Sequence, residues 1–266
     1  MKIRIASDLH LEAYRGRDMD KIVGDIFKPH AEDSNSVLVL AGDISADFKN
    51  LIDFIKHIEN DFAKVIYIPG NHEYYGKDYS ETNNALDGLF KSELKNTVWC
   101  NGSVDSHIID NVRFIYGTMW ADGGKSIQEE EMVGAGLNDF RIIGHNGRRF
   151  TVAHMQNIFY TQKGEIKRLL QKKFDGKNVV ITHHIPSYKL CHPRFGTDIN
   201  GGFAGDCENI LESPYAPDVW IYGHTHDSHD EMFMNTRMVC NPKGYPREHV
   251  GMEFNSYVSG PKLIEV

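Results

Sequence analysis

Two kinds of hydrophobic pattern alternate along the first third of the chain. Residues 3–6, 36–40 and 64–68 are short, nearly continuous apolar runs, typical of strands buried in a parallel sheet. Residues 19–27 predict a helix, and residues 48–62 predict a clearer one because their apolar positions lie three or four apart. Strands that alternate with helices favour βαβ units and a largely parallel sheet.

The pattern changes in the middle of the chain. Residues 80–90 form a weaker helical pattern. Short β-rich runs follow at residues 98–99, 106–109 and 112–116. Asp110-Asn111 is typical of a hairpin turn, so we expect antiparallel strands added to the first sheet or facing it. Residues 118–150 are irregular, polar and glycine-rich. We favour a solvated surface loop there over a flap across a pocket.

The last part of the chain returns to regular patterns. Residues 153–172 predict a long helix. Strands are predicted at residues 178–182, 218–222, 237–240 and 262–266. A glycine-rich stretch at 187–205 is long for a structureless loop and favours a functional reason. No repeat or linker interrupts the sequence, so we expect a single domain over residues 1–266.

Composition limits the functional classes. The 266 residues are 41% hydrophobic and 25% charged, as in an ordinary soluble protein. The net charge of -8 argues against a basic surface for stable nucleic-acid binding, but not against a nucleotide substrate. The four cysteines are scattered, which fits a reducing cytoplasm. We see no signal peptide and no run of ~18 apolar residues, so we expect a cytoplasmic protein without a membrane span.

Potential metal ligands follow five of the predicted strands. They are Asp8 and His10, Asp43, Asn71 and His72, His183 and His184, and His224 and His226. If these strands end at one sheet edge, the side chains converge where α/β folds bind ligands. Carboxylate, imidazole and amide groups bind Zn, Mn, Fe or Ni, and a set without thiolates argues against a structural zinc site. Two such ions would leave a cationic site that attracts phosphate.

These clusters form a recognisable ordered set. Asp8-Leu9-His10, Gly42-Asp43, Gly70-Asn71-His72-Glu73, His183 and Gly223-His224-Thr225-His226 resemble the motifs of the calcineurin-like metallophosphoesterase superfamily. Further stretches resemble its smaller bacterial and phage-type members: Gly117-Thr118-Met119-Trp120, Asn138-Asp139-Phe140-Arg141 and Cys240-Asn241-Pro242-Lys243-Gly244-Tyr245. The resemblance implies an α/β fold, a four-layer sandwich of two mixed β-sheets flanked by helices.

The resemblance also implies roles for single residues. One metal would be held by Asp8, His10 and His226, and the second by Asn71, His183 and His224. Asp43 would bridge two divalent ions (Mn, Fe, Zn or Ni, with Mn favoured), and a bridging hydroxide would be the nucleophile. His72 would be the catalytic residue that assists the leaving group. We favour hydrogen bonding behind the ligands as the role of His184.

Some assignments stay open in the sequence. Protein phosphatases of the superfamily carry an aspartate three residues after the bridging one, where this chain has Ala46. Asp47 is the nearest acid that could orient His72. Asn138 and Arg141 could contact substrate or pin the 118–150 segment, although a structural turn is favoured slightly.

The resulting hypothesis is a dinuclear metal-dependent phosphoesterase. Its substrate would be a small or nucleotide-like phosphodiester or monoester. The alternatives are a nuclease acting on nucleic acid strands and a non-catalytic scaffold of the same fold. The scaffold is disfavoured because no ligand is missing. The oligomeric state is not predicted.

Overall fold

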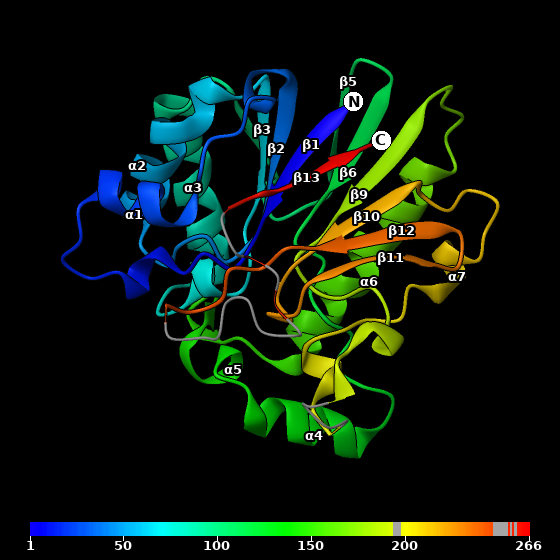
Figure 1. Cartoon of the computed structure of the whole chain (residues 1–266). Coiled ribbons are helices and arrows are strands. Elements are labelled where there is room, and N and C mark those ends of the chain that lie inside the picture. The colour runs from blue at the N-terminus through cyan, green and yellow to red at the C-terminus, as the bar shows by residue number, and fades with distance from the viewer. Residues whose placement is uncertain (194–197, 247–254, 256, 258–259) are drawn as a thin grey trace.

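The computed structural model describes residues 1–193, 198–246, 255, 257 and 260–266. Two large sheets dominate it (Figure 1). The first has the strand order β13-β1-β2-β3-β4, with β1 (Lys2–Ala6), β2 (Ser36–Ala41), β3 (Lys64–Ile68), β4 (Thr97–Trp99) and β13 (Lys262–Glu265). The first four of these strands are parallel, and β13 pairs antiparallel with β1.

The second sheet has the order β11-β12-β10-β9-β6-β5. Its strands are β5 (Asp105–Ile109), β6 (Val112–Tyr116), β9 (Lys177–Ile181), β10 (Val219–Tyr222), β11 (His229–Phe233) and β12 (Thr236–Cys240). The four inner strands are parallel, and the two edge strands are antiparallel. The hairpin expected around Asp110-Asn111 is therefore confirmed, whereas β4 runs parallel to β3 and not antiparallel.

Seven α-helices lie in the described part of the chain, and five of them cover the outer faces of the sheets. They are α1 (Met19–Ile26), α2 (Phe48–Ile58), α3 (Tyr79–Glu93), α4 (Ile127–Gly136), α5 (Asp139–Ile142), α6 (Val152–Leu170) and α7 (Glu208–Leu211). Helices α1 to α3 pack on the first sheet, and α6 and α7 pack on the second (Figure 1). Short 3-10 turns occur at Leu11–Ala13, Asp33–Asn35, Glu59–Asp61, His72–Tyr74, Tyr188–Leu190 and Asn200–Gly202.

The core between the sheets explains why the strand sequences are so apolar. Side chains such as Ile5, Val39 and Ile66 from the first sheet meet Phe114 and Ile181 from the second. A parallel strand covered on both faces needs apolar residues at nearly every position. The layers are therefore helices, sheet, sheet and helices, and the predicted mixed α/β sandwich is confirmed.

The expectation of an irregular surface loop at residues 118–150 was wrong. This segment contains α4, α5 and a small hairpin of β7 (Gly144–His145) and β8 (Arg148–Arg149). Trp120 and Phe150 are buried in a separate cluster with Tyr74 and Tyr79. The low apolar content hides this order because the cluster is completed by side chains from before residue 80. In the described part of the chain, no helix has the length and apolar character needed to cross a membrane.

Candidate metal centre

The predicted ligands come together at one edge of the sandwich. Asp8, Asp43 and Asn71 follow β1, β2 and β3 of the first sheet, while His183 and His224 follow β9 and β10 of the second. The two sheets are joined here, because the backbone N–H of His224 donates to Asp8 Oδ1 at 3.1 Å. Convergence at the carboxyl ends of parallel strands is the placement that the sequence predicted.

The backbone around these side chains is strained. Five of the seven predicted ligands have positive φ angles between 48° and 68°: Asp8, His10, Asp43, His224 and His226. The left-handed conformation costs roughly 1–2 kcal/mol for each non-glycine residue. Strain of this kind collects at functional sites, where it re-aims side chains that a regular strand end would direct elsewhere.

Two glycines allow the side chains to approach each other. A Cβ on Gly70 would lie 2.1 Å from Asp43 Oδ1, and a Cβ on Gly42 would lie 2.3 Å from His183 Nδ1. Gly42 also has a φ of +87°. Any side chain at either position would push Asp43 or His183 out of place.

One group of acceptors is formed by Asp8, His10 and His226. The Nε2 atoms of His10 and His226 face each other at 3.1 Å, and His226 Nε2 lies 3.5 Å from Asp8 Oδ1. His10 Nδ1 lies 3.3 Å from the Glu12 carboxylate, which can only accept. An N–H on Nδ1 therefore has an acceptor, and Nε2 is the His10 nitrogen that faces His226.

A second group surrounds His183. Its Nδ1 donates to the carbonyl of Ala41 at 2.8 Å, so Nε2 is the ring nitrogen left to bind a metal. That atom lies 3.2 Å from Asn71 Oδ1 and 3.4 Å from Asp43 Oδ1. Burial by itself would lower the pKa of His183, yet the Asp43 carboxylate raises it to about 9. The raised value shows how strongly this spot attracts positive charge.

His224 completes the second group. Burial, helped by His184 and His183, lowers the pKa of His224 well below its usual range, so its ring is neutral. Its Nε2 is buried and has no hydrogen-bond partner among the described residues. Because an unsatisfied buried nitrogen is costly, a ligand role fits it well. Both groups of oxygen and nitrogen acceptors thus fit divalent metal ions.

Asp43 belongs to both halves of the centre. Its ligand oxygens lie within 4.8 Å of His183 and His224 on one side and of His10 and His72 on the other. Burial would raise its pKa, but His183 and His72 lower it well below the ordinary value. An ionised carboxylate in this position could be shared by two cations.

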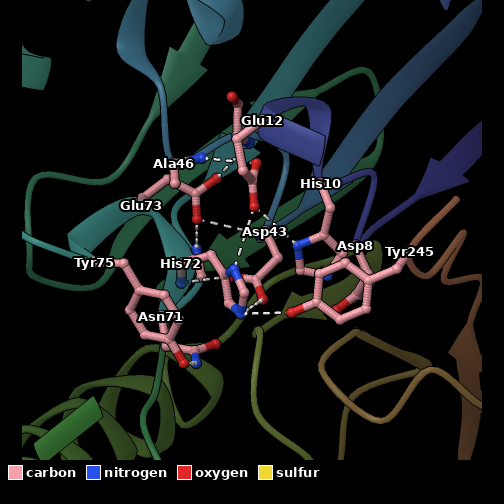
Figure 2. A network of polar contacts seen from close by, with 12 residues as sticks. Asp8, His10, Glu12, Asp43, Ala46, Asn71, His72, Glu73, Tyr75 and Tyr245 are labelled. Atoms are coloured by element: carbon pink, nitrogen blue, oxygen red, sulfur yellow. Dashed lines mark hydrogen bonds and ion pairs between the residues drawn. The ribbon is translucent and has the colours of Figure 1, made fainter. Parts of the chain in front are cut away.

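His72 lies beside the ligands and has partners of its own (Figure 2). Its Nδ1 is 3.3 Å from Glu12 Oε1, and its Nε2 is 3.9 Å from Asp43 Oδ2 and 3.1 Å from the Tyr245 hydroxyl. Burial by itself would lower the pKa of His72, but Asp43 and Glu12 raise it above the ordinary value. The shift favours the protonated ring, a proton donor, more than in an ordinary histidine.

The acid next to His72 is Glu12, which answers the question that the sequence left open, and Asp47, the nearest candidate by sequence, does not contact it. Asp47 instead caps α2 by accepting from the backbone N–H of Asn50 at 3.0 Å. Although burial acts against it, hydrogen bonds from His10 and His72 lower the pKa of Glu12 to about 2. Glu12 follows His10 by two positions in the sequence, and this short spacing was the signal that could have found it.

Comparison with known proteins decides the family. A family model described as calcineurin-like phosphoesterase matches residues 1–228. The chain belongs to the calcineurin-like phosphoesterase family. An uncharacterized protein of Acanthamoeba polyphaga mimivirus is 24% identical over 98% of both chains. The crystal structure of phosphopantetheinyl hydrolase from Mycobacterium tuberculosis has the same fold, with a TM-score of 0.72, 17% identity and coverage of 92% of this chain and 90% of that one.

Membership makes this phosphoesterase a metal-dependent hydrolase of phosphate esters. Its Glu73, in the Gly70-Asn71-His72-Glu73 motif, holds the loop that carries Asp43. The buried carboxylate accepts backbone N–H groups from Asp43, Ile44, Ser45 and Gly70 at 2.7 to 3.2 Å. Burial and the nearby Asp43 raise the pKa of Glu73 to about 7, although His183 and the backbone N–H groups of Gly70 and Ser45 act in the opposite direction.

A pocket of about 330 Å³ opens beside the predicted metal ligands of this phosphoesterase. Its lining includes Asp43, Asn71, His72, His224 and His226. The other walls come from Tyr75, Gly136, Leu137, Asn138, Asp139, Phe203, Thr225 and Tyr245. Residues 136–139 belong to the segment expected to be a surface loop, and their place in the pocket lining fits the alternative, a flap across a pocket, better. Asn138 lines the pocket, whereas the side chain of Arg141 donates a hydrogen bond to the carbonyl of Ala135.

His184 is placed differently from its expected role. It is fully buried, and neither ring nitrogen has a hydrogen-bond partner among the described residues. The ring stacks on Trp120 at 5.2 Å and lies 4.3 Å from the His224 ring. The predicted hydrogen bonding behind the ligands is therefore not made, and His184 packs against them instead.

Proposed function

We propose that this phosphoesterase hydrolyses small, nucleotide-like phosphodiesters with two divalent metal ions. The observation that carries the proposal is the position of Asp43, whose carboxylate lies close to His183 and His224 on one side and to His10 and His72 on the other. His10 also belongs to the group with Asp8 and His226, and the 330 Å³ pocket opens beside these residues. Two cations held a few ångströms apart suit in-line displacement at phosphorus because both the entering and the leaving oxygen develop negative charge.

The ligand assignment follows the two groups. Asp8, His10 and His226 would hold one ion. Asn71, His183 and His224 would hold the other, with Asp43 in contact with both. When bound, the ions supply charge stabilisation and a hydroxide at neutral pH. Mixed nitrogen and oxygen ligands fit Mn, Fe, Zn or Ni, and we favour Mn.

His72 would act on the leaving group. Glu12 keeps Nδ1 protonated and directs Nε2 toward Asp43 and the pocket. Burial and the contact with Glu12 hold the His72 ring in one orientation. A protonated imidazole can donate a proton to the departing alkoxide. After donation, the Tyr245 hydroxyl is within reach of the same nitrogen.

The substrate class is supported by the pocket wall. Tyr75, Leu137, Phe203 and Tyr245 offer aromatic and apolar surface, and Asn138 offers a neutral amide. Such a wall suits the organic group of a diester, including a flat base, better than the second charge of a monoester. The four free cysteines support the reducing cytoplasm as its location.

The test is a substrate panel with controlled metals. Linear and cyclic nucleotides, their monoesters, a phosphopantetheinyl diester and single-stranded DNA would be assayed after EDTA treatment and after addition of Mn²⁺. We expect EDTA to abolish hydrolysis and Mn²⁺ to restore it, with small diesters preferred. Hydrolysis that resists EDTA would refute the mechanism, and a preference for DNA strands would favour the nuclease alternative.

A further inference from the structure

The amide of Asn71 has two ends that face different surroundings. Its oxygen lies 3.2 Å from His183 Nε2, inside the second group of acceptors. Its nitrogen points away from the group and donates to Asp139 Oδ1 at 2.8 Å and to the Tyr75 hydroxyl at 3.1 Å. Both amide N–H groups therefore have an acceptor, and the side chain is only 3% exposed overall.

The orientation of this amide decides whether Asn71 can bind a metal. An amide rotated by half a turn has nearly the same shape, but it presents N–H donors in place of an oxygen. In that orientation the donors would face the cation, and the oxygen would face the carboxylate of Asp139. Something outside the metal site must therefore select the productive orientation.

Asp139 is well placed to select it. The residue is 3% exposed and begins α5, in the segment between β6 and α6. Backbone hydrogen bonds anchor α5 next to Asn71, from Gly76 N to Ile142 O at 3.1 Å and from Gly144 N to Lys77 O at 2.8 Å. Asp139 can thus hold its position without any contribution from the metal.

We propose that Asp139 is a positioning residue that, together with Tyr75, fixes the Asn71 oxygen toward the metal centre. The segment that forms a wall of the substrate pocket then also sets the affinity of one metal position. This inference rests on the ligand set given under the proposed function, in which Asn71 belongs to the second group only. Loss of Asp139 should therefore weaken one ion and spare the other.

The experiment measures metal content of the full-length protein. The Mn²⁺-loaded protein is dialysed against graded chelator, and bound Mn²⁺ per chain is measured by plasma mass spectrometry. Asp139→Leu should lower the affinity for one of the two ions by about 10- to 100-fold, the range found when hydrogen-bond partners of metal ligands are removed. Asp139→Asn keeps an acceptor for the Asn71 N–H and should restore most of the affinity. Tyr75→Phe should lower the affinity for the same ion by a smaller factor.

Two comparison variants separate the causes. Arg141 lies on the same short helix as Asp139, and its side chain donates to the carbonyl of Ala135. Arg141→Ala removes this hydrogen bond without changing the contacts of Asn71, so both ions should bind with wild-type affinity. Asn71→Ala should lose the ion that Asp139→Leu weakens. If Asn71→Ala loses one ion while Asp139→Leu and Tyr75→Phe keep both, the positioning role is overturned and the ligand set stands. If Asn71→Ala keeps both ions, the ligand set itself is wrong, and this inference is wrong with it.

If Asp139→Leu does not fold, Tyr75→Phe decides the matter by the same titration. Tyr75→Phe with unchanged affinity for both ions would then overturn the joint role of the two acceptors. Circular dichroism of each variant shows whether a lost ion reflects an unfolded chain.

Discussion

Two corners of the molecule place a histidine directly after a predicted metal ligand. In the corner after β3, His72 follows Asn71, and in the corner after β9, His184 follows His183. His72 is 15% exposed and contacts Glu12, Asp43 and the Tyr245 hydroxyl. His184 is fully buried and packs on Trp120 and His224 with both nitrogens unpaired within the described residues.

The difference shows that adjacency to a ligand does not determine chemistry. Burial lowers the pKa of His184 well below its ordinary value, so its ring stays neutral and packs as a flat, uncharged group. His72 is also largely buried, but two carboxylates face it and raise its pKa. The same side chain is thus suited to proton donation in one corner and to packing in the other.

The largest effect expected from this contrast comes from His72→Ala. We expect the variant to bind metal normally and to lose about 10²- to 10⁴-fold in kcat on esters with poor leaving groups, since proton donation contributes this much. An activated aryl ester should lose much less, because its leaving group departs without a proton. Steady-state kinetics on both esters, with metal content measured in parallel, checks this. Equal losses on the two esters would argue against a leaving-group role.

A smaller effect is expected from Glu12→Gln. The variant removes the acid behind His72 and His10, and we expect kcat at saturating Mn²⁺ to fall by about 10- to 100-fold. Asp47→Asn is the matched control, because it removes the same charge nearby but leaves a good helix cap on α2. Its kcat should equal that of the wild type. A similar loss in both variants would mean that general charge, and not the contact with His72, matters.

The smallest effect on turnover is expected from His184→Leu. If the ring only packs, kcat should stay within about threefold, whereas removing two unsatisfied nitrogens should raise the free energy of unfolding by about 1 kcal/mol. Urea unfolding and steady-state kinetics measure the two quantities. A drop in kcat as large as that of His72→Ala would show that the second corner also takes part in the reaction.

Much of this centre could be predicted because most of its side chains directly follow a strand in the sequence. Asp8, Asp43, Asn71, His183 and His224 each follow a parallel strand, and parallel strands of adjacent sheets bring their carboxyl ends together. Hydrophobic periodicity locates the strands, so the convergence of these side chains follows without any long-range information. The alternation of strands and helices predicted the α/β class, and the sandwich of two sheets followed from the family resemblance.

The supporting residues could not be predicted in this way. Asp139 reaches Asn71 across 68 positions of the sequence, and Tyr245 reaches His72 across 173. Glu12 is closer, but it faces His72 only because His10 takes a left-handed backbone that turns the chain. Periodicity says nothing about such turns or about contacts between distant segments.

The sequence by itself therefore determined which side chains meet at the sheet edge, because strand ends and ligand types are local features. Packing of distant segments settled which histidine faces carboxylates, which one packs against Trp120, and how the Asn71 amide is oriented by its N–H bond to Asp139. Those choices depend on burial and on charges brought in from other segments. They exist only once the two sheets and the α4–α5 segment have packed.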